Sequence, residues 1–349
     1  MHDALLPWFE SKSRDLPWRR TRDPYLVWLS EVMLQQTTVR AVMPYFERFA
    51  RRFPSVAELA AAEEDDVLAL WSGLGYYQRA RNLHRAARHM VEAHAGRFPS
   101  TLEEALTTPG IGRYTASAVL SITSGLPLPV VDGNVRRVLS RLFALAGEPW
   151  SRDTAFYELA EILLHRSRAG DWNEALMELG ATVCVPRRPA CAACPLQSMC
   201  RAHAEGSEDR FPAPRPRRAP VGITVAAALV ECGGALLLAR RSEGALLSRM
   251  WEVPQTSLES SGTPDLEGEV LERYGLSISQ GPLVVVASHA ITFRRIRLEG
   301  YVAELERPLP ADKERFVFAT ADDLGHLPLS SMTRKLALGL TARQLPLKL

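Results

Sequence analysis

Hydrophobic positions recur every three to four residues through the first 200 residues, and prolines or glycines interrupt this pattern at short intervals. Such a period is typical of amphipathic helices. It predicts helices at 25–36, 39–52, 55–61, 63–71, 76–95, 101–106, 113–124, 135–146, 153–166 and 171–183. Because no convincing alternating run interrupts them, this part of the chain is expected to be an all-α region of short helices with tight connections.

The pattern changes after residues 204–221, where prolines repeat among charges of both signs and almost nothing is apolar. That composition is typical of a semi-extended linker. Beyond it, two β-rich runs flank Gly233-Gly234, a strong hairpin signal. Further strands are expected at 282–288, 291–304 and 315–319, with helices at 265–274 and 331–340. Residues 222–349 are therefore predicted to form a separate α+β domain, in which the lone Cys232 is expected to be buried.

Length and composition narrow the class of protein. A chain of 349 residues can hold two or three domains with their own cores. It has no run of about 18 apolar residues, so no membrane partner is expected. The start, MHDALLPWFESKSRD, resembles neither a secretory signal nor a transit peptide, which favours a cytoplasmic location. The net charge of +2 is too small to indicate a nucleic-acid partner, so any basic surface must be local.

Four of the five cysteines lie close together, separated by six, two and five residues: Cys184, Cys191, Cys194 and Cys200. Four neighbouring thiolates can bind either zinc or a [4Fe–4S] cluster. Zinc sites more often pair two short CxxC hooks, and only Cys191 and Cys194 form one here. Disulfides are disfavoured because a chain without an export signal stays in a reducing compartment.

Two glycine-containing turns punctuate the stretch 107–137, TTPGIGRYTASAVLSITSGLPLPVVDGNVRR. Gly110 and Gly112 form a hairpin in front of a helix, where free N–H groups suit a phosphate oxygen and Arg113 could add a charged contact. An ordinary connection between helices is the alternative. At the second turn, Asp132 precedes another helix, where N-capping is its simplest role.

A glycine hairpin followed by an aspartate resembles the signature of the helix-hairpin-helix DNA glycosylase superfamily. SEVMLQQTTV (30–39), GLGYYQRARNL (73–83), VDGNVRRVL (131–139) and the four cysteines resemble the MutY-type adenine DNA glycosylases within it. The similarity extends from about Leu16 to Cys200, and more weakly to the C-terminus. It implies a mainly α glycosylase core, with the helix-hairpin-helix and an iron–sulfur loop, plus a C-terminal α+β Nudix-like domain.

Domain boundaries and a cofactor follow from this resemblance. Residues 1–203 would be the catalytic region, with a six-helix subdomain at 24–130 and an iron–sulfur cluster subdomain made by 1–23 with 131–203. The linker at 204–221 would lead to a Nudix-like 8-oxoguanine recognition domain at 222–349. The cysteine spacing matches the cluster loop of the superfamily, so a [4Fe–4S] cluster is the expected cofactor.

Glu31 is the first catalytic candidate. At helical spacing it shares an apolar face with Val27, Trp28 and Leu34, where a buried structural pair would be the ordinary explanation. Burial raises the pKa of a carboxyl group and lets it act as a general acid near neutral pH. Excision of a purine needs such an acid because the adenine anion is a poor leaving group. The resemblance implies that Glu31 protonates N7 of adenine.

Asp132 is the second catalytic candidate. A fixed carboxylate stabilises the positive charge that develops on the sugar, and the resemblance adds a transient covalent adduct, with Asn134 orienting Asp132 or a water. Tyr114 stands where bifunctional relatives have a lysine that forms a Schiff base, which a phenol cannot do. No lysine occurs between Lys12 and Lys313. The expected enzyme is therefore monofunctional and leaves an abasic site.

A base inside a duplex must be extruded before it can react. By resemblance, Trp18 and Arg19 help to line the base pocket, Glu178 contacts the adenine edge, and Gln35, Gln36 and Tyr76 act as a wedge that fills the opened stack. Loop packing and a solvated helix end are the ordinary alternatives for these side chains. The complete set of expected DNA-contacting positions in the helical region is Trp18, Arg19, Leu34, Gln35, Gln36, Tyr76, Gly110, Gly112, Arg113 and Glu178.

The C-terminal region departs from two Nudix-related patterns. In EGEVLERYGL (267–276), Gly268 replaces an expected Arg, and Arg273 replaces a metal-binding Glu. We therefore expect a binding module rather than a nucleotide hydrolase. Adenine glycosylases recognise 8-oxoguanine through a Phe-Ser-His motif, where this chain has Ile291-Thr292-Phe293. Thr292 keeps the hydroxyl, but the motif's His is lost, which leaves the strength of 8-oxoguanine discrimination open.

Together these patterns predict a monomeric, bacterial-type, nucleoid-associated repair enzyme that acts on double-stranded DNA with an A:8-oxoguanine or A:G mispair. One alternative is a glycosylase of the same fold with another base specificity, of the endonuclease III kind or for T/G mispairs. The other is a non-catalytic iron–sulfur DNA-binding protein. The absent lysine and the Nudix-like region argue against the first, and the retention of both Glu31 and Asp132 argues against the second.

Overall fold

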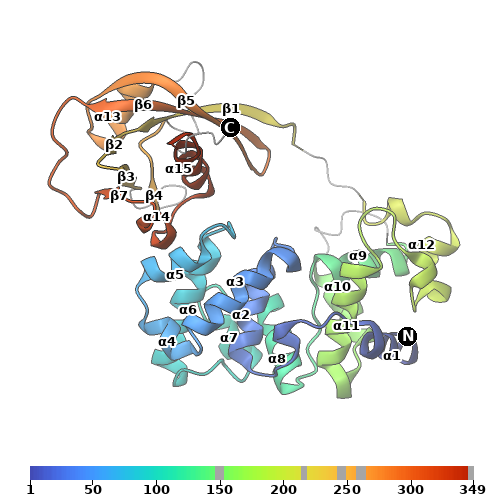
Figure 1. The fold of residues 1–349 in the computed structure, drawn as a ribbon. Coiled ribbons are helices and arrows are strands. Elements are labelled where there is room, and N and C mark those ends of the chain that lie inside the picture. Colours follow the sequence, from blue (N-terminus) through green and yellow to red (C-terminus); the bar gives the residue numbers. More distant parts are fainter. Residues whose placement is uncertain (146–152, 214–217, 242–248, 257–264, 345–349) are drawn as a thin grey trace. The chain divides into compact units, whose positions relative to one another are not determined.

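The computed structural model describes residues 1–145, 153–213, 218–241, 249–256 and 265–344. The chain, whose helices and strands are labelled in Figure 1, forms two compact units, and each is made from two stretches of sequence. The first unit contains Met1–Ala61 and Asn82–Pro216, and the second contains Ala62–Arg81 and Arg217–Leu349. The division of residues 1–203 into two subdomains stays a prediction. The structure groups Ala62–Arg81, which lie inside the expected 24–130 subdomain, with the C-terminal part of the chain.

The first unit is helical throughout its described residues, as the hydrophobic period predicts. Its helices are α1 (His2–Lys12), α2 (Pro24–Leu34), α3 (Val39–Arg52), α4 (Val56–Ala61), most of α6 (Gln78–His94), α7 (Leu102–Thr107), α8 (Arg113–Ser124), α9 (Gly133–Leu142), α10 (Asp153–Leu163), α11 (Ala169–Thr182) and α12 (Arg201–Ala204). Every predicted helix of this unit is confirmed, with ends displaced by a few residues at most.

Local signals explain where these helices begin and end. Asp23 caps α2 by accepting a hydrogen bond from the Tyr25 N–H at 2.8 Å, and Pro24 occupies the first helical position. Gly125 ends α8 in the left-handed conformation, with φ of 69°. Both α2 and α9 begin at a capping aspartate. Each cap fixes the residue at which its helix starts, and therefore the face of the helix on which each following side chain lies.

Apolar side chains of α1, α9, α10 and α11 form one core, in which Trp172 of α11 is fully buried. Cys184, Cys194 and Cys200 pack against the edge of this core. The chain's first residues therefore pack with residues more than 130 positions later. Gly180 permits the close approach of α11 to α9, because a Cβ atom there would lie 2.6 Å from the Cβ atom of Asn134.

Two sheets are formed by the described residues of the second unit. In the first, the strand order is β1 (Val221–Leu229), β6 (Arg294–Leu305) and β5 (Ile278–Ile291), with β1 parallel and β5 antiparallel to β6. In the second, β3 (Ala235–Arg240) pairs antiparallel with β2 (Glu231–Cys232), β4 (Trp251–Glu252) and β7 (Phe316–Ala319). The helices of this unit are α5 (Glu64–Trp71), α13 (Leu266–Tyr274), α14 (Asp323–His326) and α15 (Ser331–Gln344), besides the start of α6. The predicted α+β class is confirmed.

Two local predictions are wrong. The strand expected at 291–304 was placed across a turn: Ile291 ends β5, β6 begins at Arg294, and Thr292 takes a positive φ of 53° between them. Cys232 is exposed, because β2 is a two-residue strand with both side chains outside the core.

Part of the expected linker at 204–221 has regular structure. Its residues Glu208–Arg210 form a short 3-10 helix, and β1 begins at Val221. The buried Arg141 of α9 draws this segment onto the first unit, since its Nε atom donates to the Glu208 and Phe211 carbonyl oxygens at 3.0 and 2.9 Å. Residues 214–217 of the linker lie outside the described part of the chain. No helix among the described residues is long and apolar enough to cross a membrane.

Candidate active site

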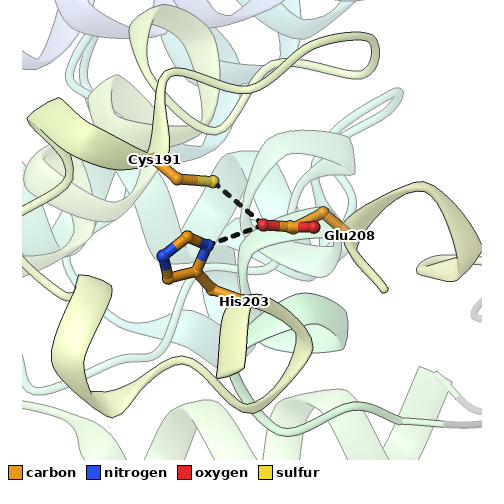
Figure 2. A group of neighbouring side chains, drawn as sticks. All are labelled: Cys191, His203 and Glu208. Atoms are coloured by element: carbon orange, nitrogen blue, oxygen red, sulfur yellow. Dashed lines mark hydrogen bonds and ion pairs between the residues drawn. The ribbon is translucent and has the colours of Figure 1, made fainter. Parts of the chain in front are cut away.

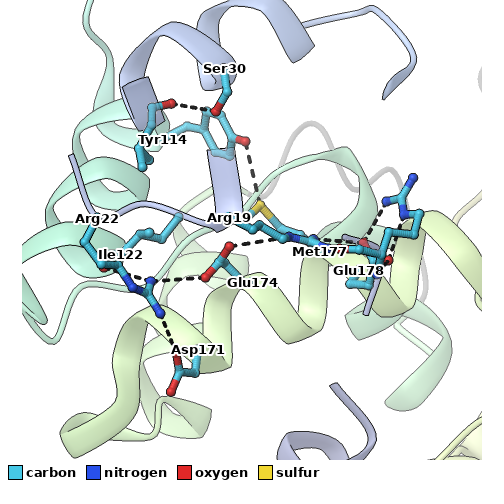
Figure 3. A network of polar contacts seen from close by, with 11 residues as sticks. Arg19, Arg22, Ser30, Tyr114, Ile122, Asp171, Glu174, Met177 and Glu178 are labelled. Atoms are coloured by element: carbon cyan, nitrogen blue, oxygen red, sulfur yellow. Dashed lines mark hydrogen bonds and ion pairs between the residues drawn. The ribbon is translucent and has the colours of Figure 1, made fainter. Parts of the chain in front are cut away.

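Glu31 lies inside the first unit, on a helix whose residues from Val27 to Met33 are all buried. Its side chain meets Tyr114 of α8, whose hydroxyl donates a hydrogen bond to the Glu31 Oε2 atom. The same hydroxyl lies 3.7 Å from the Met177 sulfur of α11 (Figure 3). Burial raises the pKa of Glu31 to about 7, against the lowering effect of the Tyr114 hydrogen bond. Glu31 is therefore a carboxyl group that can hold a proton near neutral pH.

Asp132 has a different set of partners. It caps α9: its Oδ1 atom accepts from the Val135 N–H at 2.7 Å, and its Oδ2 atom accepts from the Asn134 side-chain amide at 2.9 Å. Burial raises the pKa of Asp132, whereas these hydrogen bonds and the charge of Arg137 oppose the rise. Capping and a chemical role are compatible here, because the cap fixes the carboxylate without covering it on all sides.

The two carboxyl groups occupy one neighbourhood around Tyr114. The charge of Asp132 contributes to the raised pKa of Glu31. Burial and then the charges of Glu31 and Asp132 raise the pKa of Tyr114 well above its usual value, so this phenol stays protonated. Glu31, whose pKa is raised, lies next to Asp132, which accepts hydrogen bonds from two donors. Two carboxyl groups in such different environments can act one as a general acid and the other as a stabilising anion.

Arg137 of α9 extends the hydrogen-bond chain away from Asp132. One of its Nη atoms donates to the Asn134 Oδ1 atom and to the Gly180 carbonyl oxygen, both at 2.8 Å. Its Nε atom donates to the Cys184 carbonyl oxygen at 2.7 Å. The sequence prediction missed Arg137. Its helical position about one turn after Asp132 was the available signal, but two of its partners, Gly180 and Cys184, lie more than 40 residues later.

Glu178 of α11 is almost fully buried and binds two arginines of the N-terminal segment. Arg14 donates to it from its backbone N–H at 3.1 Å and from its guanidinium at 2.7 Å to each oxygen. Arg19 donates to its Oε2 atom at 2.8 Å (Figure 3). Burial alone would raise the pKa of Glu178, but these hydrogen bonds lower it to about 2. Sequence reasoning identified Arg19 and Glu178 but missed Arg14.

A second carboxylate on α11 continues this polar network. Glu174 lies 3.5 Å from the Arg19 Nε atom and 3.3 Å from Arg22, which also pairs with Asp171 at 3.0 Å (Figure 3). The network fixes the N-terminal segment against α11. Any ligand group that binds Glu178 must share its oxygens with Arg14 and Arg19, since both oxygens already accept hydrogen bonds.

The remaining predicted residues near α2 differ in exposure. Trp18 is buried and packs edge-on against Phe46, with ring centroids 5.1 Å apart. Leu34 ends α2 and is half-buried, and the Gln35 amide lies 3.4 Å from the Thr115 hydroxyl. Gln36 is exposed with φ of 56°. A non-glycine residue in this region of backbone space is strained, and such strain is concentrated at functional sites.

The glycine hairpin in front of α8 has the predicted backbone. Gly110 has φ of 78°, and a Cβ atom there would lie 2.6 Å from the Asn82 Cβ atom. Gly112 is the N-cap residue of α8 and has open space around it. The Arg113 guanidinium lies 3.9 Å from the centre of the Tyr157 ring. The exposed start of α8 therefore carries backbone donors and a positive charge together.

The four predicted cysteine ligands come together beside α9. Burial raises the pKa of Cys191, Cys194 and Cys200, and the charge of Cys184 raises it further for each of them. Four thiols gathered in this way could bind either zinc or a [4Fe–4S] cluster.

One cysteine also has polar neighbours. The ligand atoms of Cys191, His203 and Glu208 lie within 4.8 Å of one another. Glu208 sits between the other two, 2.7 Å from the His203 ring and 3.4 Å from the Cys191 sulfur (Figure 2). Arg141 approaches another cysteine, with a guanidinium nitrogen 3.5 Å from the Cys184 sulfur. The loop therefore places an anion and a cation at two different sulfurs.

Two predicted positions belong to the second unit. Tyr76 is half-exposed, with φ of 50°, in the connection between α5 and α6. Thr292 is exposed at the β5–β6 turn, and its hydroxyl donates to the Ile291 carbonyl oxygen at 2.7 Å. Each is a strained, exposed residue at the tip of a connection, which is where contacts with a ligand are commonly made.

Comparisons with known proteins identify both regions. Residues 29–162 match the "HhH-GPD superfamily base excision DNA repair protein" family, and residues 225–338 match the "NUDIX domain" family. The adenine DNA glycosylase of Rattus norvegicus is 37% identical over 365 residues, covering 88% of this chain and 71% of that protein. The Mus musculus and Homo sapiens proteins of the same name are 39% and 38% identical, over 60% and 58% of their lengths and 74% of this chain.

Solved structures resemble the helical part. A thermostable thymine-DNA glycosylase is 30% identical, with a TM-score of 0.54, and covers 58% of this chain and 94% of its own. A trapped endonuclease III–DNA covalent intermediate gives a TM-score of 0.51 over the same shares at 22% identity, which shows the fold alone.

The environment of Glu31 predicts the pH at which its carboxyl group titrates. By carbon-detected NMR, the Glu31 carboxyl should titrate near pH 7, because its folded-state pKa is raised to about 7. Asp132→Asn should lower that midpoint by removing a nearby negative charge, and Tyr114→Phe should raise it by removing a hydrogen bond to the ionised form. Glu178 is the internal control, since it should stay ionised to about pH 2. A midpoint for Glu31 near the ordinary carboxyl value would contradict this electrostatic assignment.

Proposed function

This chain belongs to the adenine DNA glycosylases, and we propose that it removes adenine from A:8-oxoguanine and A:G mispairs in double-stranded DNA. The observation that carries the proposal is the pairing of Glu31, whose pKa burial raises to about 7, with a hydrogen-bonded Asp132 around Tyr114. Hydrolysis of the N-glycosidic bond needs an acid for the base and an anion for the sugar, and this pair supplies both.

In the proposed reaction, Glu31 transfers its proton to N7 of the extruded adenine. The bond between N9 and the sugar carbon then breaks, and its electron pair leaves with the base. Asp132 stabilises the oxocarbenium ion and forms a transient bond to the sugar carbon. Water replaces Asp132 there, and the proton it loses restores Glu31. This sequence uses the two carboxyl groups as retaining glycosidases do.

Tyr114 and Asn134 are the proposed positioning residues for this pair. Tyr114 donates to the Glu31 Oε2 atom, and because its phenol stays protonated it cannot accept the proton meant for adenine. Asn134 holds one Asp132 oxygen. With no amine at position 114, a Schiff base cannot form, so the proposed enzyme cleaves the base from the sugar and leaves the strand intact.

DNA would be bound by several separate elements. We assign adenine recognition to the Arg19–Glu178 pair beside Trp18 and Leu34, and stack filling to Gln35, Gln36 and Tyr76. Phosphate binding is assigned to Gly110, Gly112 and Arg113 at the start of α8, where free N–H groups and positive charge coincide. Stacking of an aromatic ring on a base contributes about 1–3 kcal/mol, which supports Tyr76 as the main wedge.

The proposed cofactor is a [4Fe–4S] cluster held by Cys184, Cys191, Cys194 and Cys200, whose spacing along the chain matches the cluster loop of the superfamily and supports it. When bound, such a cluster would cross-link the loop and could exchange electrons. This chain's own residues would orient that loop: Arg141 donates to the Val185 and Pro186 carbonyl oxygens at 2.7 and 3.0 Å. Arg137 holds the Cys184 carbonyl oxygen, which joins the loop to the helix capped by Asp132.

We assign the C-terminal region to recognition of the base opposite adenine, with the Thr292 hydroxyl at the contact. Arg273, which stands at a Nudix metal-ligand position, donates to the Gln255 carbonyl oxygen and lies 3.7 Å from the buried Glu252 carboxylate. Tyr274 donates to the same carboxylate at 2.8 Å. An internal cation in this place supports a binding module over a hydrolase. We further propose a monomer that works on the bacterial-type nucleoid in the cytoplasm.

Base release from defined duplexes tests this specificity. Single-turnover assays should show release of adenine opposite 8-oxoguanine and opposite guanine, with no release of thymine opposite guanine or of thymine glycol. Borohydride should trap no enzyme–DNA adduct. The 30% identity to a thymine-DNA glycosylase makes thymine the informative competitor. Release of thymine but not adenine would replace the proposed specificity, and binding without any release would make the protein a non-catalytic one.

Substitution of each carboxyl group tests the proposed mechanism. Glu31→Gln removes the transferable proton and should slow excision by about 10²–10⁴-fold. Asp132→Asn removes the anion and should slow it by about 10²–10³-fold. Both variants should keep their thermal unfolding midpoint and their affinity for the mispair within a few fold. Near-normal excision by either variant would refute the two-carboxylate mechanism.

A further inference from the structure

The connection between α5 and α6 displays Tyr76 on a tightly bonded loop. Gly73 and Gly75 have φ of 102° and 77°, and Tyr76 has φ of 50°. The Gly75 carbonyl oxygen accepts from the Trp71 indole and from the Arg79 guanidinium, each at 3.1 Å. The tyrosine ring is 50% exposed, whereas its neighbours Leu74 and Tyr77 are buried. The loop thus holds one aromatic side chain outward on a strained backbone.

Residues near the C-terminus bind this loop within the second unit. The Ser72 hydroxyl donates to the Leu329 carbonyl oxygen at 2.6 Å, and the Tyr77 hydroxyl donates to the same oxygen at 3.3 Å. The Arg334 Nε atom donates to the Ser72 hydroxyl oxygen at 3.1 Å. The buried Ser72 hydroxyl therefore donates to one C-terminal residue and accepts from another.

The C-terminal side of this contact is itself fixed. Leu329 is fully buried, and it bridges to Trp251 of β4, whose N–H donates to the Pro328 carbonyl oxygen at 3.0 Å. The Ser330 hydroxyl accepts from the Thr333 N–H at 3.1 Å and so caps the start of α15. Leu329 and Arg334 thus stand on either side of a capped helix start, which leaves them little freedom to follow a displaced loop.

Helix α15 also contacts the strand that ends at the Thr292 turn. The ammonium group of Lys335, the residue after Arg334, donates to the Ser288 carbonyl oxygen of β5. One further turn along α15, a Cβ atom on Gly339 would lie 2.6 Å from a Val285 methyl carbon, so helix and strand are closely packed. Adjacent residues of α15 therefore bind the Tyr76 loop and the strand leading to Thr292.

We propose that Arg334 and Ser72 are positioning residues that join the Tyr76 loop to α15. Through this joint, the Tyr76 loop that opens the stack and the Thr292 turn that reads the opposite base belong to one rigidly connected part of the second unit. This inference rests on the proposed function, which assigns the DNA contacts of Tyr76 and Thr292. Loss of this joint should reduce the preference for A:8-oxoguanine over A:G more than it reduces the rate of base excision. The reason is that neither Arg334 nor Ser72 is assigned to the reacting carboxyl groups.

The test compares Arg334→Ala and Ser72→Ala with Arg334→Lys, a conservative variant, and with Arg307→Ala, a change at an exposed arginine of the same unit. Hydrogen exchange of the free protein should become about tenfold faster at the amides of residues 73–77 in both alanine variants. Exchange in β3 and β7 should stay unchanged, which shows that the unit is still folded. Arg307→Ala should match the wild type, and Arg334→Lys should fall between wild type and Arg334→Ala.

The functional half uses the ratio of single-turnover rates, and of dissociation constants, for the A:8-oxoguanine and A:G duplexes. Both alanine variants should lose about tenfold of the wild-type preference, with a smaller effect on the A:G rate. Unchanged exchange at 73–77, or faster exchange with an unchanged preference in both ratios, would overturn the proposal. If the wild type releases adenine from neither duplex, the proposed function fails, and the exchange data with the binding ratio still decide whether the joint exists.

Discussion

Burial of the Glu31 carboxyl group against Tyr114 is the interaction on which the proposed chemistry depends. An isolated carboxyl in water is ionised at neutral pH, and only an environment that penalises the charge keeps a proton available. Here α2 is buried along most of its length, and Glu31 is buried with it. In the proposed mechanism, the rest of the first unit serves to place the Asp132 carboxylate beside this proton donor.

Helix α9 achieves that placement from one end. Asp132 is fixed by the N-terminal N–H groups and by Asn134, and the arginines at 137 and 141 hold the cysteine loop against the same helix. Gly180 lets α11 approach the Asn134 position closely. The Asp132 carboxylate, the cysteine loop and the helix carrying Glu178 are thus parts of one packed assembly, in which a displacement of any one element strains the others.

The sequence was informative where a signal is local. Helix α8 matches its predicted limits because Gly112 precedes it and Gly125 follows it, and the apolar neighbours of Glu31 correctly indicated burial. Prediction failed where a residue's partner lies far along the chain. Arg14 binds Glu178 across 164 positions, and nothing near Arg14 indicates that partner. The grouping of Ala62–Arg81 with the C-terminal region was equally invisible, because it rests on Leu329 and Arg334. The β5–β6 turn was misplaced because Thr292 is β-branched and gives no turn signal, although it adopts a left-handed conformation.

The most direct test of the central claim changes the proton acceptor instead of the enzyme. A duplex with 7-deazaadenine opposite 8-oxoguanine keeps the base-pairing edge of adenine but replaces N7 with a carbon that cannot accept the Glu31 proton. Single-turnover assays with the wild-type protein should show binding within a few fold of the adenine duplex and excision slowed by at least about 10²-fold, the usual size of a general-acid contribution. Excision of 7-deazaadenine at a rate near that of adenine would contradict the role assigned to the buried carboxyl group.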